Sequence, residues 1–268
     1  MIIERPLVPL PSPGELERQV LEAWDETVQA MRHWPVGRLL PRLLRKPGSA
    51  RPSLGELDPC WEVLWHELSA VAMKNDASAA FKPGRSFREA HILEDVLPLV
   101  EASLASADPK NFLDLIGRIA QSATGTSTGF RTKAVYLVAD ASGAKVRFAH
   151  VGKVLPRIAE LHGYLRRHVV THPLLCALIA MVTITNCHPF MDGNGRTSRI
   201  LFNAILRSSR SIETYFPLYE MFWCSGCGWE VRLRYTAFTG DWMPLCRYMR
   251  DVFGIAHHWL SDESVLLT

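Results

Sequence analysis

An apolar run that ends in a glycine-rich polar loop constrains this chain more than any other feature. Residues 173–187 read PLLCALIAMVTITNC, with a proline at the start and no charged side chain. Proline is favoured in the first turn of a helix, and a helix that is apolar on every side is buried. The run therefore predicts a central buried helix over 173–187, too short to span a bilayer, that delivers His188 to a loop.

Two glycines in this loop allow a tight turn and a close approach of the backbone to a ligand. Gly193 and Gly195 flank Asn194, and neither has a side chain to obstruct that approach. Beyond the loop, apolar residues recur at helical spacing at positions 200, 201, 204 and 205. The loop is therefore expected to open onto a helix N-terminus, whose unpaired N–H groups and dipole favour a phosphate.

Charged and titratable side chains surround this predicted phosphate site. Arg196 and Arg199 are three residues apart, so they can face the same side of the first helical turn. Asp192 offers a hard oxygen ligand that could hold Mg²⁺ against the phosphates. His188, with an ordinary pKa of roughly 6.5, can accept a proton from a hydroxyl at neutral pH. Each feature alone has an ordinary structural explanation, and their joint spacing is what indicates a catalytic site.

Residues 188–199, HPFMDGNGRTSR, resemble the signature of the Fic (Fic/Doc) family, His-x-Phe-x-(Asp/Glu)-Gly-Asn-Gly-Arg-x-x-Arg, at every fixed position. The resemblance implies a mainly α fold, a Fic-type helical bundle with a β-hairpin flap next to the active site. It also implies the protein adenylyltransferase branch, which transfers AMP from ATP to a Ser, Thr or Tyr hydroxyl of a target protein and releases pyrophosphate.

The same resemblance implies a role for each motif residue, with Mg²⁺ as cofactor and ATP as co-substrate. The roles are His188 as general base, Asp192 as metal ligand, Gly193, Asn194 and Gly195 as the lining of the α-phosphate site, and Arg196 and Arg199 as contacts to the outer phosphates. Relatives that transfer other groups have a lysine in place of Gly195 or an alanine in place of Gly193. This chain has neither change, which favours AMP transfer.

Two other hypotheses stay open at this point. One is transfer of another nucleotide or phosphate-containing group to a protein or small-molecule acceptor. The other is a non-catalytic nucleotide-sensing protein with the same fold. An intact His188 argues against the second.

A hairpin is expected ahead of the motif. The residues Gly129, Phe130 and Arg131 introduce two short strand-like segments, 133–138 and 145–150, around the turn sequence ADASGA. In the family that this chain resembles, such a hairpin holds an extended segment of the target protein by strand pairing. We therefore expect the target protein to bind along the flap at about 133–150.

Restraint by an internal glutamate is not expected from the sequence. Many Fic enzymes carry a helix with (Ser/Thr)-x-x-x-Glu-(Gly/Asn), whose glutamate pairs with the second motif arginine. Upstream, around 69–75, Met73 or Lys74 takes the place of that glutamate, and Glu213 is followed by Thr214. Arg199 is therefore expected to be free, with inhibition absent, of another kind, or supplied by a separate inhibitory protein.

The 268 residues divide into a proline-rich and basic N-terminal extension over 1–55 and a Fic-type catalytic domain with flanking helices over 56–268. A net charge of +3 is too small to indicate nucleic-acid binding. The six cysteines show no disulfide-scaffold spacing, and the first residues do not resemble a signal peptide. These features predict a cytoplasmic protein with no stable membrane insertion.

Overall fold

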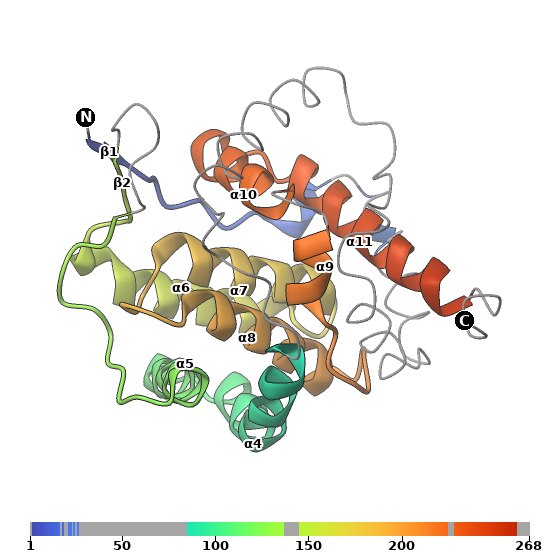
Figure 1. Cartoon of the computed structure of the whole chain (residues 1–268), viewed down its shortest axis with the longest axis horizontal. Coiled ribbons are helices and arrows are strands. Elements are labelled where there is room, and N and C mark those ends of the chain that lie inside the picture. The colour runs from blue at the N-terminus through green and yellow to red at the C-terminus, as the bar shows by residue number, and fades with distance from the viewer. Residues whose placement is uncertain are drawn as a thin grey trace.

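The computed structural model describes residues 2–16, 85–136, 145–224 and 228–261, together with positions 18, 21, 22, 24 and 26. The described residues are mainly helical, as predicted (Figure 1). The elements, labelled as in the figure, are β1 (Ile2–Glu4), η1 (Pro13–Glu15), α4 (Arg85–Ala105), α5 (Pro109–Thr124), β2 (Lys145–Arg147), η2 (Val151–Lys153), α6 (Val154–His168), α7 (Pro173–Cys187), α8 (Asn194–Ser208), α9 (Leu218–Cys224), α10 (Gly228–Thr239) and α11 (Met243–Ser261).

Helix α7 is the centre of the core and begins and ends where the sequence predicts. Pro173 occupies its first turn, and every other side chain except that of Thr185 is buried. Helices α6 and α8 pack against α7, and α4 and α5 pack against α8 (Figure 1). Because α7 is apolar on all sides, it can be covered by neighbouring helices without leaving a polar group unpaired.

Helix α5 shows how local sequence sets the helix ends next to the site. The carboxylate of Asp108 accepts a hydrogen bond of 2.9 Å from the backbone N–H of Lys110, and Pro109 follows in the first turn. At the other end, Gly125 adopts a left-handed conformation with φ 71° and closes the helix. These ends fix Ala123 and Thr124 beside the glycine loop.

The predicted hairpin is not confirmed. The described part of its first segment forms one antiparallel bridge, between Tyr136 and Arg147, and the predicted turn lies outside the described residues. The second segment instead forms β2, which pairs in parallel with β1 in the register Ile3 to Val146. This pairing could not be predicted, because a three-residue strand that starts at position 2 has no local signal for a partner that starts at position 145.

The described part of the N-terminal extension packs onto the helical core. The carbonyl of Pro6 accepts a hydrogen bond of 3.2 Å from Asn186 at the end of α7, and the carbonyl of Val8 accepts one from Arg157. Val8, Leu16 and Trp24 are buried in the same hydrophobic core as the helices. The predicted boundary near residue 55 and the basic segment before it lie outside the described residues.

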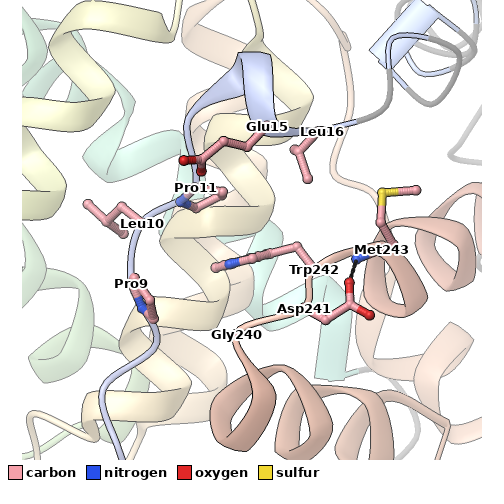
Figure 2. Close-up of a pocket in the computed structure, with 9 residues that line it drawn as sticks. All are labelled: Pro9, Leu10, Pro11, Glu15, Leu16, Gly240, Asp241, Trp242 and Met243. Carbon is pink, nitrogen blue, oxygen red and sulfur yellow. Dashed lines mark hydrogen bonds between the residues drawn. The ribbon is translucent and has the colours of Figure 1, made fainter.

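A cleft of about 170 Å³ lies between the N-terminal segment and the turn that precedes α11. Figure 2 shows the residues that line it. Pro9 and Leu10 line one side and Trp242 the other, while the carboxylate of Asp241 accepts a hydrogen bond of 2.9 Å from the N–H of Met243 and caps α11. The residues that line this cleft do not include any of 188–199. It is therefore separate from the predicted catalytic loop.

Among the described helices, none is both long and apolar enough to cross a membrane.

Candidate active site

His188 is the C-cap residue that directly follows the last residue of α7. It adopts a left-handed backbone conformation with φ 52°, and its N–H donates to the carbonyl of Ile184 at 3.0 Å. A non-glycine residue in this conformation costs about 1–2 kcal/mol, so its surroundings must hold it there. One such contact is the ring of Phe148, which stacks on the imidazole with centroids 3.9 Å apart and planes 18° from parallel.

The environment of His188 favours a neutral imidazole. Burial lowers the pKa of His188 to about 4. A hydrogen bond with the backbone of Thr185 acts in the opposite direction, and the positive charges of Arg5 and Arg131 add to the lowering. Its Nδ1 atom is buried and has no hydrogen-bond partner among the described residues. The side chain as a whole stays partly exposed. An imidazole with these properties is unprotonated at neutral pH and can accept a proton.

A pH dependence follows from this depressed pKa. The folded state binds fewer protons at His188 than the unfolded state between pH 4 and roughly 6.5. The contribution of His188 to stability is therefore complete above that window and is lost as the pH falls through it. We expect any reaction that uses neutral His188 to keep its rate from pH 8 to below pH 6 and to decline only near pH 4. A rate profile with an acid limb centred near pH 6.5 would contradict this expectation.

The glycine loop forms the N-terminus of α8, as predicted. Gly193 is the N-cap, with φ 86°, and its carbonyl accepts from the N–H of Thr197 at 2.8 Å. The side chain of Asn194 is 3% exposed and turns back onto Phe190, donating to its carbonyl at 2.9 Å and accepting from its N–H at 3.0 Å. Asn194 thus braces the loop with its side chain, and only its backbone N–H faces the predicted phosphate site.

Gly193 cannot be replaced without strain. A methyl group on its Cα would lie 2.7 Å from Cγ2 of Thr124, and the positive φ disfavours any side chain. We expect Gly193→Ala to lower the free energy of unfolding by about 1–2 kcal/mol from the backbone alone, measured by denaturant titration. The matched control is Gly195→Ala inside α8, where the new methyl would sit at an ordinary 3.4 Å from Arg199. Equal stability of the two variants would contradict this reading of the loop.

Arg196 and Asp192 form an ion pair at the mouth of the loop. Nη2 of Arg196 lies 2.8 Å from Oδ2 of Asp192, and Nη1 donates to the carbonyl of Ala123. The Asp192 side chain is 80% exposed. Partial desolvation raises its pKa, but the N–H of Gly193 at 2.6 Å and the Arg196 guanidinium outweigh that effect and hold the pKa below its usual value. Asp192 is therefore an accessible, ionised carboxylate.

Arg199 is not free, contrary to the expectation from the sequence. Its Nε donates to Oε2 of Glu89 at 3.0 Å and its Nη2 donates to Oε1 of the same carboxylate, which makes the pair bidentate. The two side chains are only 11% and 2% exposed, respectively. Burial opposes the charge of Arg199, yet Glu89 more than offsets it and the pKa of Arg199 lies above its ordinary value. An internal glutamate thus occupies the second motif arginine.

Glu89 is held in place by more than Arg199. The hydroxyl of Tyr215 donates to its Oε2 at 2.6 Å. The start of α4 is fixed by Glu220 of α9, which accepts from the N–H of Ser86 at 3.3 Å. The ring of Tyr219 lies under both Arg85 and Arg199, with guanidinium carbons 4.4 and 5.2 Å from its centroid. These contacts seat the carboxylate against the helix α8.

One feature of the sequence could have indicated that Glu89 is buried and paired. The buried residues of α4 fall at positions 86, 89, 93, 96, 100 and 103, the spacing of a single helical face. Glu89 is the one charged residue among them, and a charge on the buried face of a helix requires a buried partner. The identity of that partner could not be inferred, because Arg199 is 110 residues away.

The structure brings the predicted site residues together. His188, Asp192 and Gly193 lie on the connection between α7 and α8, and Asn194 and Gly195 are the first two residues of α8. A methyl group built on Gly193 would lie 4.0 Å from Nη2 of Arg196, and one built on Gly195 would lie 3.4 Å from Nη1 of Arg199, so both guanidinium groups flank the glycines. Their roles toward a nucleotide stay predictions.

Comparison with known proteins agrees with this geometry. Residues 108–206 match the model of the Fic/DOC family. The "Protein adenylyltransferase Fic" of Drosophila erecta is 50% identical over 90 residues, and that of Drosophila virilis is 32% identical over 85 residues. These alignments cover 31% and 30% of this chain, and the chain spans 16% and 15% of the two relatives.

The fold is similar to that of a solved structure. Fic-1 (residues 134–508) from C. elegans superposes with a TM-score of 0.51 at 18% sequence identity, covering 93% of this chain and 73% of that structure. At this identity the likeness concerns the fold. The family match covers both helices that flank the catalytic loop and the loop itself. Over residues 108–206, this chain is similar to the Fic/DOC family.

Proposed function

We propose that this protein transfers AMP from ATP to a hydroxyl group of a target protein. The observation that carries the proposal is the juxtaposition on one connection of a neutral imidazole and a helix N-terminus flanked by two arginines. The names of the curated relatives support the same reaction. A helix N-terminus binds phosphate through its unpaired N–H groups, and the imidazole lies at the start of the same loop.

The reaction requires one proton transfer and one displacement. His188 accepts the proton of the target hydroxyl, and the oxygen forms a bond to the α-phosphorus of ATP. The bond between the α-phosphorus and the bridging oxygen breaks, and pyrophosphate leaves with the electron pair. The N–H groups at the start of α8 stabilise the charge that develops on the α-phosphate. Arg196 then neutralises the departing pyrophosphate, and Arg199 does so once Glu89 has released it.

Asp192 is suited to hold Mg²⁺ in this reaction. It is an exposed, ionised oxygen ligand, and Mg²⁺ is commonly held by one or two carboxylates together with substrate phosphates and water. Within the described residues, no group of three His, Cys, Asp or Glu side chains could form a protein-only metal site. When bound, Mg²⁺ would neutralise charge on the outer phosphates. Asp192 must exchange its contact with Arg196 for the metal.

Two parallel labels test the proposal. The purified protein is incubated with Mg²⁺ and a lysate, and with ATP labelled at either the α- or the γ-phosphate. We expect the α-label alone to appear on protein, because Gly195 leaves the cradle open. A γ-label on protein would overturn AMP transfer in favour of phosphate transfer. Glu89→Gln should release Arg199 from its ion pair. If neither label appears on protein with this variant, a nucleotide-sensing protein is favoured.

Asp192→Ala should weaken Mg²⁺-dependent ATP binding and slow transfer, since a metal held by few protein oxygens depends on each one. The variant also releases Arg196, so Asp192→Asn serves as the matched control that keeps the side-chain volume. Calorimetric titration of ATP with and without Mg²⁺ separates the two effects. If Mg²⁺ still strengthens ATP binding in Asp192→Ala as it does in the wild type, the metal role of Asp192 is excluded.

A further inference from the structure

Arg131 is a buried cation between the ends of the flap segment and the loop that carries His188. Its side chain is 4% exposed. Nε donates to the carbonyl of His188 at 2.7 Å, Nη1 to that of Lys133 at 3.1 Å, and Nη2 to those of Cys187 at 3.2 Å and Ala149. One guanidinium thus satisfies four backbone carbonyls from three separate stretches of chain.

The end of α7 balances the charge of Arg131. Within the described parts of the chain, Arg131 forms no ion pair, and the acceptors of its side chain are all carbonyl oxygens. Cys187 is the last residue of α7 and His188 is its C-cap. Carbonyls at a helix C-terminus lack intrahelical partners and carry the negative end of the helix dipole. Arg131 therefore caps the helix that presents His188.

The same side chain also controls what touches the imidazole. Ala149, whose carbonyl binds Arg131, directly follows Phe148, whose ring stacks on that of His188. The backbone N–H of Arg131 donates to the carbonyl of Pro189 at 2.8 Å, on the other side of the histidine. The backbone before, at and after His188 is thus fixed to one residue, together with the partner of its ring.

We propose that Arg131 is a positioning residue for His188. Its hydrogen bonds hold the left-handed C-cap of α7, Lys133 and Ala149 at fixed positions relative to one another. A hydroxyl presented along the flap then meets the imidazole at a fixed distance. This inference rests on the proposed function. The hydrogen bonds of Arg131 end at Pro189, before the glycine cradle, so Arg131 acts on the base and not on the nucleotide.

Two variants and one control test this role. Arg131→Met removes the donors and keeps much of the volume, and Arg131→Lys keeps the charge but loses the planar fork. The control is Arg232→Met, because Arg232 is also buried, at 5% exposure, and donates to a carbonyl within α10. We expect Arg131→Met to lower kcat by about 10²-fold, the scale of a small misplacement of reacting groups, with the Kd of MgATP changed less than about twofold. Arg131→Lys should lie between the wild type and Arg131→Met.

A spectroscopic readout separates positioning from general destabilisation. In nucleotide-free protein, the ring signals of His188 should titrate near pH 4 in the wild type and in Arg232→Met. In Arg131→Met the titration should move toward the ordinary value of roughly 6.5, because the charge of Arg131 is lost and the ring leaves its stacked, buried position. Arg131→Lys keeps the charge, so a shift in that variant reports the change in ring position alone. If Arg131→Met does not fold, Arg131→Lys carries the same measurements.

The outcomes are distinct. A His188 titration unchanged in both Arg131 variants, or a loss of kcat no larger than that of Arg232→Met, would overturn the positioning role. A Glu89→Gln protein that transfers no label would contradict the proposed function alone. In that case the His188 titration in the Arg131 variants still decides whether Arg131 positions the ring.

Discussion

Replacing His188 should nearly abolish transfer while leaving ATP bound. Loss of a general base typically costs 10²–10⁴-fold in rate, and the contacts of the glycine cradle with phosphate do not involve the imidazole. Alanine tolerates a left-handed backbone poorly, whereas asparagine adopts it more readily. His188→Asn is therefore the sharper variant, since it removes the base and keeps the turn at φ 52°. The measurements are the α-label on target protein and the Kd of MgATP.

The matched control for this experiment is His91→Ala, which removes an exposed histidine of α4. We expect it to label targets at the wild-type rate. If His188→Asn labels targets as fast as this control, the proton must be accepted elsewhere and His188 has only a structural role. If His188→Asn loses ATP binding as well, the loop has collapsed and the experiment reports on folding.

The helix before the site could be predicted from the sequence because its signal is local. The bounds of α7 were correct, since an uncharged run with a proline at its start permits little else. The prediction that the glycine loop opens onto a helix N-terminus was also correct, because glycine spacing and the apolar residues of α8 lie within a few turns of one another. Both rest on contacts between residues close in sequence, where pattern and propensity decide the structure.

The parts that the sequence missed depend on contacts between distant segments. The pairing of β1 with β2 joins residues 2–4 to residues 145–147, and a short strand carries no information about its partner. Asn194 was predicted to help line the phosphate site, which stays a prediction, and the sequence did not indicate that its side chain braces Phe190. An amide next to a turn can bind backbone or ligand with equal ease, so composition alone does not choose between them.

Removing the charge of Glu89 on α4 should have the second large effect, on ATP binding. Glu89 forms an ion pair with Arg199, the arginine that the outer phosphates of ATP would bind. Glu89→Gln keeps the size of the side chain and removes its charge. Hydrogen bonds to charged groups are worth about 1.5–3 kcal/mol each, so releasing Arg199 should tighten ATP binding by roughly 10- to 100-fold. Transfer at subsaturating ATP should rise with it. The measurements are the Kd of MgATP and the initial rate of α-labelling.

Glu89→Gln should lower the free energy of unfolding while it raises the affinity for ATP. Opposite changes in these two quantities identify an ion pair that blocks the site. Breaking one side of a buried ion pair costs about 3–5 kcal/mol, so nucleotide-free Glu89→Gln should unfold more easily, and ATP should restore more stability to it than to the wild type. Glu94→Gln is the matched control. Glu94 lies on α4 like Glu89 and pairs with Arg207 of α8 at 3.4 Å, but its side chain is 62% exposed. A Glu89→Gln variant that loses both stability and ATP affinity would mean that the pair supports the site. Opposite changes would mean that Glu89 and phosphate compete for Arg199.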